Sequence, residues 1–339
     1  MSFQRNVVRK GGAGYEHTRR YTAFSERVPE RYPEVIVEVR DVDDVVAAIN
    51  IAKDEDRKIS VRSGGHHWNA SHLRDGAVLI DMHNMTDYAV DTDAMTAWAE
   101  PGLRGSDLNK ALQEIDLFFP TGHCTDVSIG GFLLQGGVCW DNHRYGPSCG
   151  HVYAVDVVTA DGEQVHATDD NEYSDLLWAA RGAGAGFFGF VVKYHIKLYP
   201  RRLAVNSLYI YPSRLLEDVF AFTQKVGPDT PTEINMLTFW NEELDTEAPV
   251  IALNAMSHAD TEEPGPSHER TPGRATGSRS PATWAGARCS TKRSRSSPNA
   301  TPTRTRPTSR RCGLRSTQAP SRRAPASDPV VSVAASRAR

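Results

Sequence analysis

The sequence contains few cysteines, no long apolar run and no secretory leader. Its 339 residues include five cysteines, and no two of them form a Cys-x-x-Cys pair. We therefore expect reduced thiols rather than a disulfide framework. The first residues lack the apolar segment of a signal peptide, and no run approaches the roughly 18 apolar residues that a membrane span needs. These absences favour a cytoplasmic protein without a membrane partner.

The last quarter of the chain lacks the apolar residues that a folded core needs. Residues 257–339 hold 16 Lys and Arg against 5 Asp and Glu, although the net charge of the whole chain is only -3. They also contain 10 of the 20 prolines, and Trp284 is their single aromatic residue. We expect this segment to be disordered, because it cannot offset its ordering entropy by burial. Basic side chains without interleaved aromatic ones do not indicate a nucleic-acid partner.

Before residue 257 the apolar pattern predicts strands that alternate with helices. Residues 34–40 alternate apolar and charged side chains, which is typical of a half-buried strand, and Asp41 is placed to cap the next helix. Ser106 and Asn171 are placed to begin two further helices, and residues 214–225 form another. Residues 1–31 are expected to be an irregular lead-in. Further strands are predicted at residues 58–62, 78–81, 96–100, 152–160, 164–168, 187–199, 205–211, 235–240 and 250–253.

The first of two glycine-rich stretches is Arg62-Ser63-Gly64-Gly65-His66-His67-Trp68, which directly follows a predicted strand. Two consecutive residues without a Cβ allow backbone N–H groups to converge on an anion such as a pyrophosphate. A strand that ends in two glycines is also common in a plain turn. This stretch alone therefore indicates a ligand only weakly.

The second stretch, residues 119–146, places Cys124 ahead of two glycine pairs, Gly130-Gly131 and Gly136-Gly137. Four glycines in eight residues disfavour a simple core helix. They suit a backbone that passes close to a flat ring system. Trp140 and the segment Arg144-Tyr145-Gly146 follow, where they would close over one edge of such a ring.

Three other kinds of site are less well supported. Residues 184–189 match the Gly-x-Gly-x-x-Gly pattern, but the predicted helix precedes the strand, the reverse of a dinucleotide-binding unit. His66, His67 and His72 lack nearby ligands at metal-site spacing, so no metal is expected. Cys124 adjoins His123, but neighbours on a strand point to opposite faces, and no Gly-x-Ser-x-Gly elbow indicates a hydrolase.

Six segments identify a family when they are taken together. They are RSGGHHW, FPTGHC, GGFLLQGGVCW, RYG, VDVVTADG and LLWAARGAGAGFFGFVVKYHIKLYP. In order and spacing they resemble the PCMH-type flavin domain of the vanillyl-alcohol-oxidase superfamily. The most similar branch comprises the berberine-bridge-enzyme-like and 6-hydroxynicotine-oxidase-like FAD oxidases. The resemblance covers about residues 20–256.

The resemblance implies an α+β fold with FAD between two subdomains. Residues 1–200 (core 30–200) would form this domain, residues 201–256 the start of an antiparallel-sheet substrate domain, and residues 257–339 the disordered tail. The chemistry implied is hydride transfer from a small organic substrate to flavin, with O2 as acceptor. No general base can be named, and the oligomeric state is left open.

The resemblance also implies roles for individual residues. His66 matches the histidine that bonds covalently to the flavin, and Cys124 matches the cysteine that supplies a second bond in bicovalent members. Trp140 and Tyr145 are candidates for the substrate pocket. The complete set of candidate cofactor contacts is Arg62, Ser63, Gly64, Gly65, His66, His67, Gly122, Cys124, Gly130, Gly131, Gly136, Gly137, Tyr145, Gly146, Val191 and Val192.

The tail departs most from the family, whose members continue the substrate domain for well over a hundred residues. The abrupt change to Arg, Pro, Ser, Thr and Ala suggests a coding frame shifted near residue 257. A natural basic tail is the alternative explanation. If half of the enzyme is missing, the chain would be an inactive product with only a residual flavin-binding domain.

Overall fold

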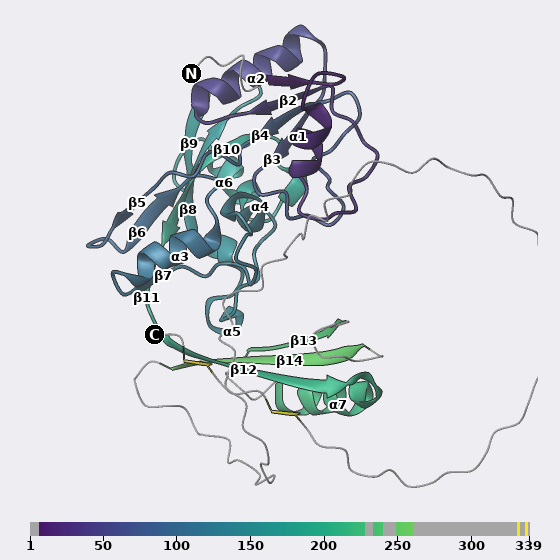
Figure 1. Ribbon diagram of the computed structural model, residues 1–339. Helices are drawn as coiled ribbons and strands as arrows, with labels where there is room; N and C mark the ends of the chain where they lie inside the picture. The colour runs from purple at the N-terminus through teal and green to yellow at the C-terminus, as the bar shows by residue number, and fades with distance from the viewer. Residues whose placement is uncertain (1–6, 228–232, 240–248, 260–330, 333–335, 338–339) are drawn as a thin grey trace, which may run out of the picture. The chain divides into compact units, whose positions relative to one another are not determined.

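The computed structural model describes residues 7–227, 233–239, 249–259, 331–332 and 336–337 (Figure 1). The fold of these residues is α+β, as predicted, with three larger sheets and one two-stranded pair. Within this described part, no helix is both long and apolar enough to cross a membrane.

The first sheet has the strand order β1-β2-β4-β3. Strands β2 and β3 run parallel to β4, whereas β1 is antiparallel to β2. The Asp41 side chain accepts a hydrogen bond from the backbone N–H of Asp44 at 2.9 Å, which confirms the predicted cap of α2. The elements are β1 (Val7–Arg9), α1 (Tyr15–Tyr21), β2 (Val35–Glu38), α2 (Val42–Asp54), β3 (Ile59–Arg62) and β4 (Val78–Asp81).

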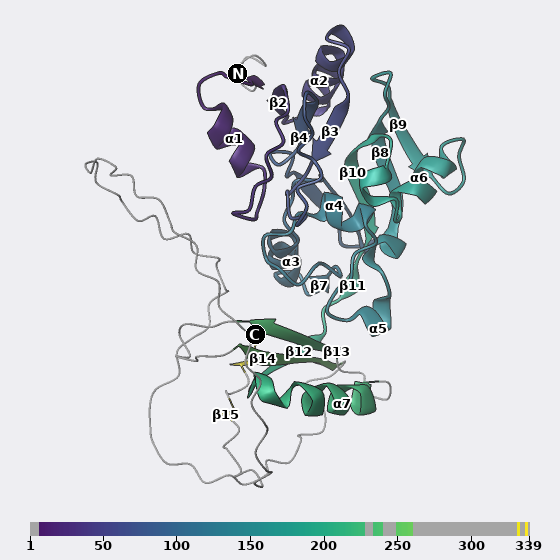
Figure 2. The same ribbon diagram turned by 90° about the vertical axis from the view of Figure 1, so that its right-hand side faces the viewer.

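Alternate residues of β2 face two different cores, because successive strand side chains point to opposite faces. Val35 and Val37 lie in a core with Val45 of α2. Ile36 lies in a second core with Tyr15 of α1. The two helices therefore cover opposite faces of this sheet, which can be followed in Figure 2.

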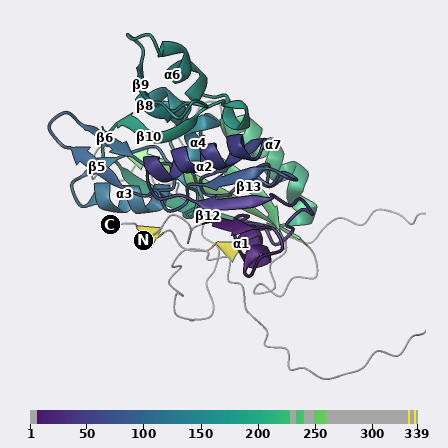
Figure 3. The ribbon, with the colours of Figure 1, turned by 90° about the horizontal axis from the view of Figure 1, so that it is seen from above.

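The second sheet is antiparallel throughout, with the order β5-β6-β10-β8-β9. One face packs against α3, α4 and α6 in the largest core, and Figure 3 shows α6 beside β8 and β9. The short strands β7 and β11 pair with each other. The elements are β5 (Tyr88–Asp91), β6 (Thr96–Ala99), α3 (Gly105–Gln113), β7 (Leu117–Phe118), α4 (Ile129–Leu134), α5 (Asn142–Tyr145), β8 (Val152–Val158), β9 (Gln164–Thr168), α6 (Ser174–Ala180), β10 (Phe190–Lys197) and β11 (Tyr199–Pro200).

The third sheet is antiparallel, with the order β13-β14-β12-β15, and β16 also pairs with β12. Val219 of α7 contributes to a small core with Ile251 and Leu253 of β14. The elements are β12 (Leu203–Pro212), α7 (Leu216–Val226), β13 (Glu233–Phe239), β14 (Val250–Ala259), β15 (Val331–Ser332) and β16 (Ser336–Arg337). The antiparallel sheet after residue 200 was predicted. The limits of the three domains stay a prediction.

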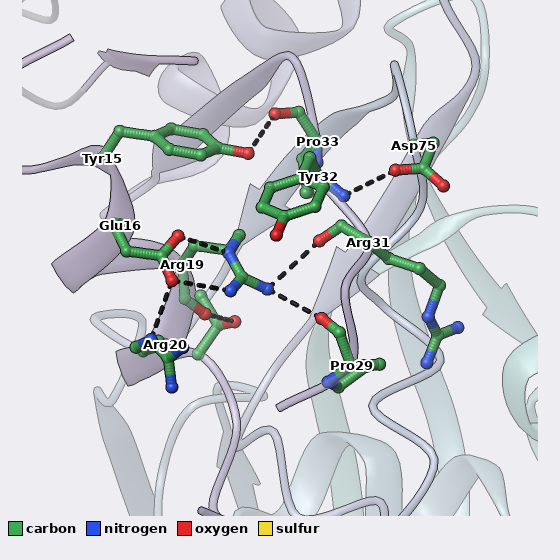
Figure 4. Close-up of polar contacts among 10 residues, drawn as sticks. Tyr15, Glu16, Arg19, Arg20, Pro29, Arg31, Tyr32, Pro33 and Asp75 are labelled. Carbon is green, nitrogen blue, oxygen red and sulfur yellow. Dashed lines mark hydrogen bonds and ion pairs between the residues drawn. The ribbon is translucent and has the colours of Figure 1, made fainter. Parts of the chain in front are cut away.

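The N-terminal lead-in was predicted to be irregular, and this was wrong. It contains β1 and α1, and the guanidinium of Arg19 holds it to the following loop (Figure 4). Arg19 is 1% exposed and donates hydrogen bonds to the Glu16 carboxylate at 2.8 Å and to the backbone oxygens of Pro29 and Arg31. The Tyr15 hydroxyl donates to the Pro33 oxygen at 2.6 Å. The mainly polar sequence of residues 1–31 gives no apolar pattern from which this structure could be predicted, because the stabilising contact is made by a charged side chain.

Several predicted element boundaries were also wrong. Ser106 lies inside α3, where its hydroxyl donates to the Thr125 oxygen instead of capping the helix. The helix expected from Asn171 begins at Ser174, and the Asn171 side chain accepts bonds from nearby backbone N–H groups. The single strand predicted at residues 187–199 is instead two strands, β10, which ends at Lys197, and β11, whose last residue is Pro200. Strand β5 was not predicted, because its side chains are mostly exposed and show no apolar alternation.

The tail that was predicted to be disordered, residues 257–339, lies mostly outside the described residues. Strand β14 continues to Ala259, past the expected limit at residue 257, because it pairs along its length with β12. Residues 331–332 (β15) and 336–337 (β16) pair with β12. The disorder expected for residues 260–330 lies outside the described residues.

Candidate functional site

A buried ion pair anchors the end of β3, where the first glycine-rich stretch begins. Arg62 donates to both carboxylate oxygens of Asp81 at 2.8 Å, and the two side chains are 7% and 1% exposed. Burial raises the pKa of Asp81, but Arg62 and His83 lower it by more, so the net shift is downward. Arg62 also donates to the Gly64 oxygen at 3.3 Å. The structure thus makes Arg62, a candidate cofactor contact, the anchor of the loop.

The loop after β3 requires glycine for the chain's own contacts. Gly65 has φ +71°, and a Cβ there would lie 1.9 Å from the Thr22 oxygen. A Cβ at Gly64 would lie 2.7 Å from the Ser128 hydroxyl oxygen. Both contacts are far below van der Waals distance, so neither glycine tolerates a side chain. The close approach of residues 64 and 128 also brings the two glycine-rich stretches together, as predicted.

Three backbone donors of this loop have no hydrogen-bond partner among the described residues. No described residue accepts a hydrogen bond from the backbone N–H groups of Gly64, Gly65 and His66. Consecutive N–H groups around a left-handed residue form a concave anion site. By contrast, the first N–H groups of α4 are satisfied internally, since Ile129 donates to Leu103 and Gly130 to Pro101. The residues present therefore fit a phosphate group at the loop rather than at the helix.

Two side-chain hydrogen bonds join the first stretch to the second. The Gly131 N–H donates to the Ser63 hydroxyl oxygen at 2.9 Å. The His66 Nε2 lies 3.1 Å from a carboxylate oxygen of Asp126, which is 56% exposed. Sequence reasoning missed Asp126, because a single aspartate in a loop has no distinguishing pattern.

The imidazole of His66 is fixed in orientation and in tautomer. Its ring stacks on Phe24 at 4.1 Å between centroids and 9° between planes. Because an ionised carboxylate only accepts hydrogen bonds, the contact with Asp126 places the proton of a neutral imidazole on Nε2. The lone pair is then on Nδ1, which is the atom free to bond to a ligand. The adjacent His67 is exposed, and its Nδ1 accepts a bond from the Asn69 N–H.

Cys124 lies two residues before Asp126, in the same exposed loop. Burial raises the pKa of its thiol, and the negative charge of Asp126 raises it further. Less thiolate is therefore present than for a free cysteine, and the thiolate is the nucleophilic form. Cys139 and Cys149, the other cysteines in the described region, are buried and unbridged.

Gly137 of the second glycine pair and Gly122 both lie against the ring of Phe132, an aromatic side chain of the protein itself. A Cβ at Gly137, which has φ +78°, would lie 2.7 Å from the Phe132 ring, and a Cβ at Gly122 would lie 3.2 Å from it. Gly136 has φ +105° and open space around it. The four glycines do not share one helix: Gly130 and Gly131 belong to the short helix α4, whereas Gly136 and Gly137 lie beyond its end. A Cβ at Gly130 would lie 2.7 Å from the Cβ of Pro101, so close approach explains this glycine.

The two candidate pocket residues, Trp140 and Tyr145, lie in different environments. Trp140 stacks on His123 at 4.0 Å. Tyr145 lines a cavity of about 440 Å³ with Arg144, His151, Tyr199, Pro200, Arg201 and Arg202. In this cavity His151 donates from Nε2 to the Tyr145 backbone oxygen at 2.9 Å, and burial lowers the pKa of His151. His151 and Tyr199 were not predicted, because only the fold brings them beside Tyr145.

The remaining candidates lie in the backbone around these features. Gly146 has φ +66°, which ends the short helix α5 after Tyr145. Val191 and Val192 are both buried, and they face two different cores on opposite sides of β10. Their side chains are therefore part of the protein interior on either side.

Comparison with known proteins points to the same cofactor. A model of the FAD binding domain family matches residues 33–168. The FAD-linked oxidoreductase nodO of Hypoxylon pulicicidum is 34% identical over 250 residues, which cover 74% of this chain and 55% of nodO. The (R)-6-hydroxynicotine oxidase of Paenarthrobacter nicotinovorans is 33% identical over 183 residues, covering 53% of this chain and 40% of the oxidase.

A solved structure supports the same fold. The crystal structure of 6-hydroxy-D-nicotine oxidase from Arthrobacter nicotinovorans superposes with a TM-score of 0.67 and 25% identity. The match covers 76% of this chain and 56% of that chain. The chain thus spans little more than half the length of nodO and of this solved structure.

Proposed function

We propose that the chain is an FAD-linked oxidoreductase of the berberine-bridge-enzyme-like and 6-hydroxynicotine-oxidase-like kind, and that it oxidises a small organic substrate; the match to the FAD binding domain model and the FAD-linked relatives support this. The substrate would be an alcohol, a sugar or an amine, and O2 would accept the electrons. When bound, FAD supplies the hydride acceptor. The names of the relatives support the redox class, and the substrate class is our inference.

The observation that carries this proposal is the loop formed by residues 63–66. The N–H groups of Gly64, Gly65 and His66 would bind the pyrophosphate oxygens. Because the Ser63 oxygen already accepts a bond from Gly131, its hydroxyl proton is available to the same anion. The Arg62–Asp81 pair holds the start of this loop in place.

We further propose that His66 holds the flavin covalently, with Cys124 as a second attachment point. The contact with Asp126 leaves the Nδ1 lone pair of His66 as the nucleophile, and stacking on Phe24 fixes its direction. The raised pKa of Cys124 makes its thiol the weaker nucleophile in this state. His66 is thus the principal attachment in this proposal.

Acid precipitation of the purified chain tests the attachment. Covalent flavin stays yellow in the pellet, and each single variant, His66→Ala and Cys124→Ala, is expected to keep one link, whereas the double variant releases the flavin. In the Cys124→Ala background, Asp126→Ala should lower the fraction of acid-stable flavin, and Thr125→Ala, a neighbouring control, should not. A colourless pellet from the unaltered chain, or complete loss of flavin in one single variant, would contradict dual attachment.

Peroxide production separates the oxidase from the inactive alternative. We expect peroxide from the flavin-loaded chain with at least one member of a panel of alcohols, sugars and amines. Bound flavin without peroxide on every substrate would instead favour a residual flavin-binding domain without turnover. The mass of the purified chain shows in the same preparation whether FAD is attached and what C-terminus the protein has.

A further inference from the structure

Three potential metal ligands converge on the second sheet, on the face turned away from the candidate flavin loop. They are Asp156 of β8, His166 of β9 and His195 of β10. The neighbours of His195 in the strand, Tyr194 and Ile196, point into the core with α4, where the Tyr194 hydroxyl donates to the Gly130 oxygen at 3.0 Å. Since side chains alternate along a strand, His195 points to the opposite face. The three-residue cluster is therefore distinct from the flavin site.

The geometry of the cluster suits a single small cation. One oxygen of Asp156 lies 2.6 Å from Nδ1 of His166 and 3.1 Å from Nε2 of His195, and all three atoms lie within 4.8 Å of one another. With metal–nitrogen and metal–oxygen bonds of about 2.0–2.2 Å, ligand atoms around a tetrahedral zinc ion are separated by roughly 3.4 Å. Small movements of the side chains would therefore admit a cation at the centre.

The three residues lie on paired strands, and the site is open to solvent on one side. Asp156 and His166 are directly opposite each other in the β8–β9 ladder, and β10 pairs with β8 on the other side. The His166 side chain is 53% exposed, whereas those of Asp156 and His195 are largely covered, at 14% and 19%. Water would therefore complete the coordination from the His166 side.

A second cluster in the described residues, Glu38 with Asp81 and His83, is less suited to a metal ion. Both Asp81 oxygens accept hydrogen bonds from Arg62, so a metal ion would have to displace a buried guanidinium. In the first cluster the carboxylate contacts only imidazoles, which are themselves good metal ligands.

We propose that Asp156, His166 and His195 bind one divalent transition-metal ion of the Zn²⁺, Ni²⁺ or Cu²⁺ class. Two imidazoles and one carboxylate form a ligand set that binds such ions in preference to Ca²⁺ or Mg²⁺, which favour ligand sets made of oxygen atoms. The bound ion joins β8, β9 and β10 across the sheet. It needs neither FAD nor substrate.

Zinc titration of the full, untagged chain after chelator treatment tests this site. Competition with a chromophoric chelator is expected to show a binding site whose affinity falls at least about tenfold in His166→Ala and in His195→Ala. His17→Ala removes an exposed histidine that belongs to neither cluster, and it should leave this affinity unchanged. Equal affinity in the unaltered chain and both cluster variants, or no zinc binding at all, would overturn the proposal.

Copper provides a second measurement that identifies the ligands. The electron paramagnetic resonance spectrum of the Cu²⁺-loaded chain should show coupling to two imidazole nitrogens, and His195→Ala should reduce this to one. An unchanged spectrum would place the copper elsewhere. Circular dichroism of each metal-free variant checks that the fold is retained, and Asp156→Asn, which keeps the side-chain shape, should weaken zinc binding in the same way.

Discussion

Replacement of Asp81 by Asn should destabilise the protein strongly, because it leaves the guanidinium of Arg62 buried without a counter-charge. The side chains of the pair are 7% and 1% exposed, and Arg62 donates to both carboxylate oxygens at 2.8 Å. Breaking a buried pair by removing one partner costs about 3–5 kcal/mol. This is a large part of the roughly 5–15 kcal/mol by which a domain is stable. Urea unfolding, followed by tryptophan fluorescence and circular dichroism, measures the loss.

The double variant Arg62→Met/Asp81→Leu separates the buried charge from the ion pair itself. Two apolar side chains remove both charges, and such replacements are often neutral or stabilising. The double variant should therefore lose less stability than Asp81→Asn alone. A loss below about 1 kcal/mol for Asp81→Asn, the size seen for exposed pairs, would refute the argument that this pair is dry and holds the loop.

Three further predictions concern the same subdomain. Gly65→Ala should cost more than about 2 kcal/mol in urea unfolding, because it adds a clash with the Thr22 oxygen to the left-handed strain, whereas Gly11→Ala, with φ +80° and open space, should cost only the strain of about 1–2 kcal/mol. Arg19→Met should cost about 2–4 kcal/mol through its lost carbonyl and carboxylate bonds, and the exposed Arg20→Met less than about 1 kcal/mol. Burial lowers the pKa of His72 to about 4, so the His72 side chain binds a proton more readily in the unfolded chain than in the folded one. Its contribution to stability is complete above the ordinary pKa of 6.5 and is lost as the pH falls toward 4, at about 1.4 kcal/mol per pH unit; in His72→Gln this slope should be absent.

The elements with the clearest apolar period were predictable, because their pattern follows directly from burial. Strand β2 forms where it was predicted, although it is buried on both faces rather than half-buried, and Asp41 caps α2 as expected. The boundaries that were wrong depend on contacts with distant residues. Ser106 is drawn away from a capping role by the Thr125 oxygen, and α1 is held by the buried Arg19.

The candidate site shows the same division. The sequence placed His66, Cys124 and the glycine pairs in one region, and the contacts of Ser63 with Gly131 and of His66 with Asp126 join the two stretches. The roles of individual glycines were less predictable. Gly64 and Gly65 are required by contacts with protein atoms, and Gly137 by the Phe132 ring, none of which is adjacent in sequence.

The sequence by itself predicted the α+β class and showed a resemblance to FAD-linked oxidases, because local apolar periods and the order of motifs are written along the chain. Only the tertiary structure decided which atoms face one another. It paired Arg62 with Asp81 in a buried ion pair. It left three loop N–H groups without a partner among the described residues, so that they can bind an anion. It also brought Asp156, His166 and His195 together from three strands. The physical reason is that strand pairing joins residues far apart in the chain, such as those of β6, β10 and β8, and a local pattern of residue types does not show which strands become neighbours.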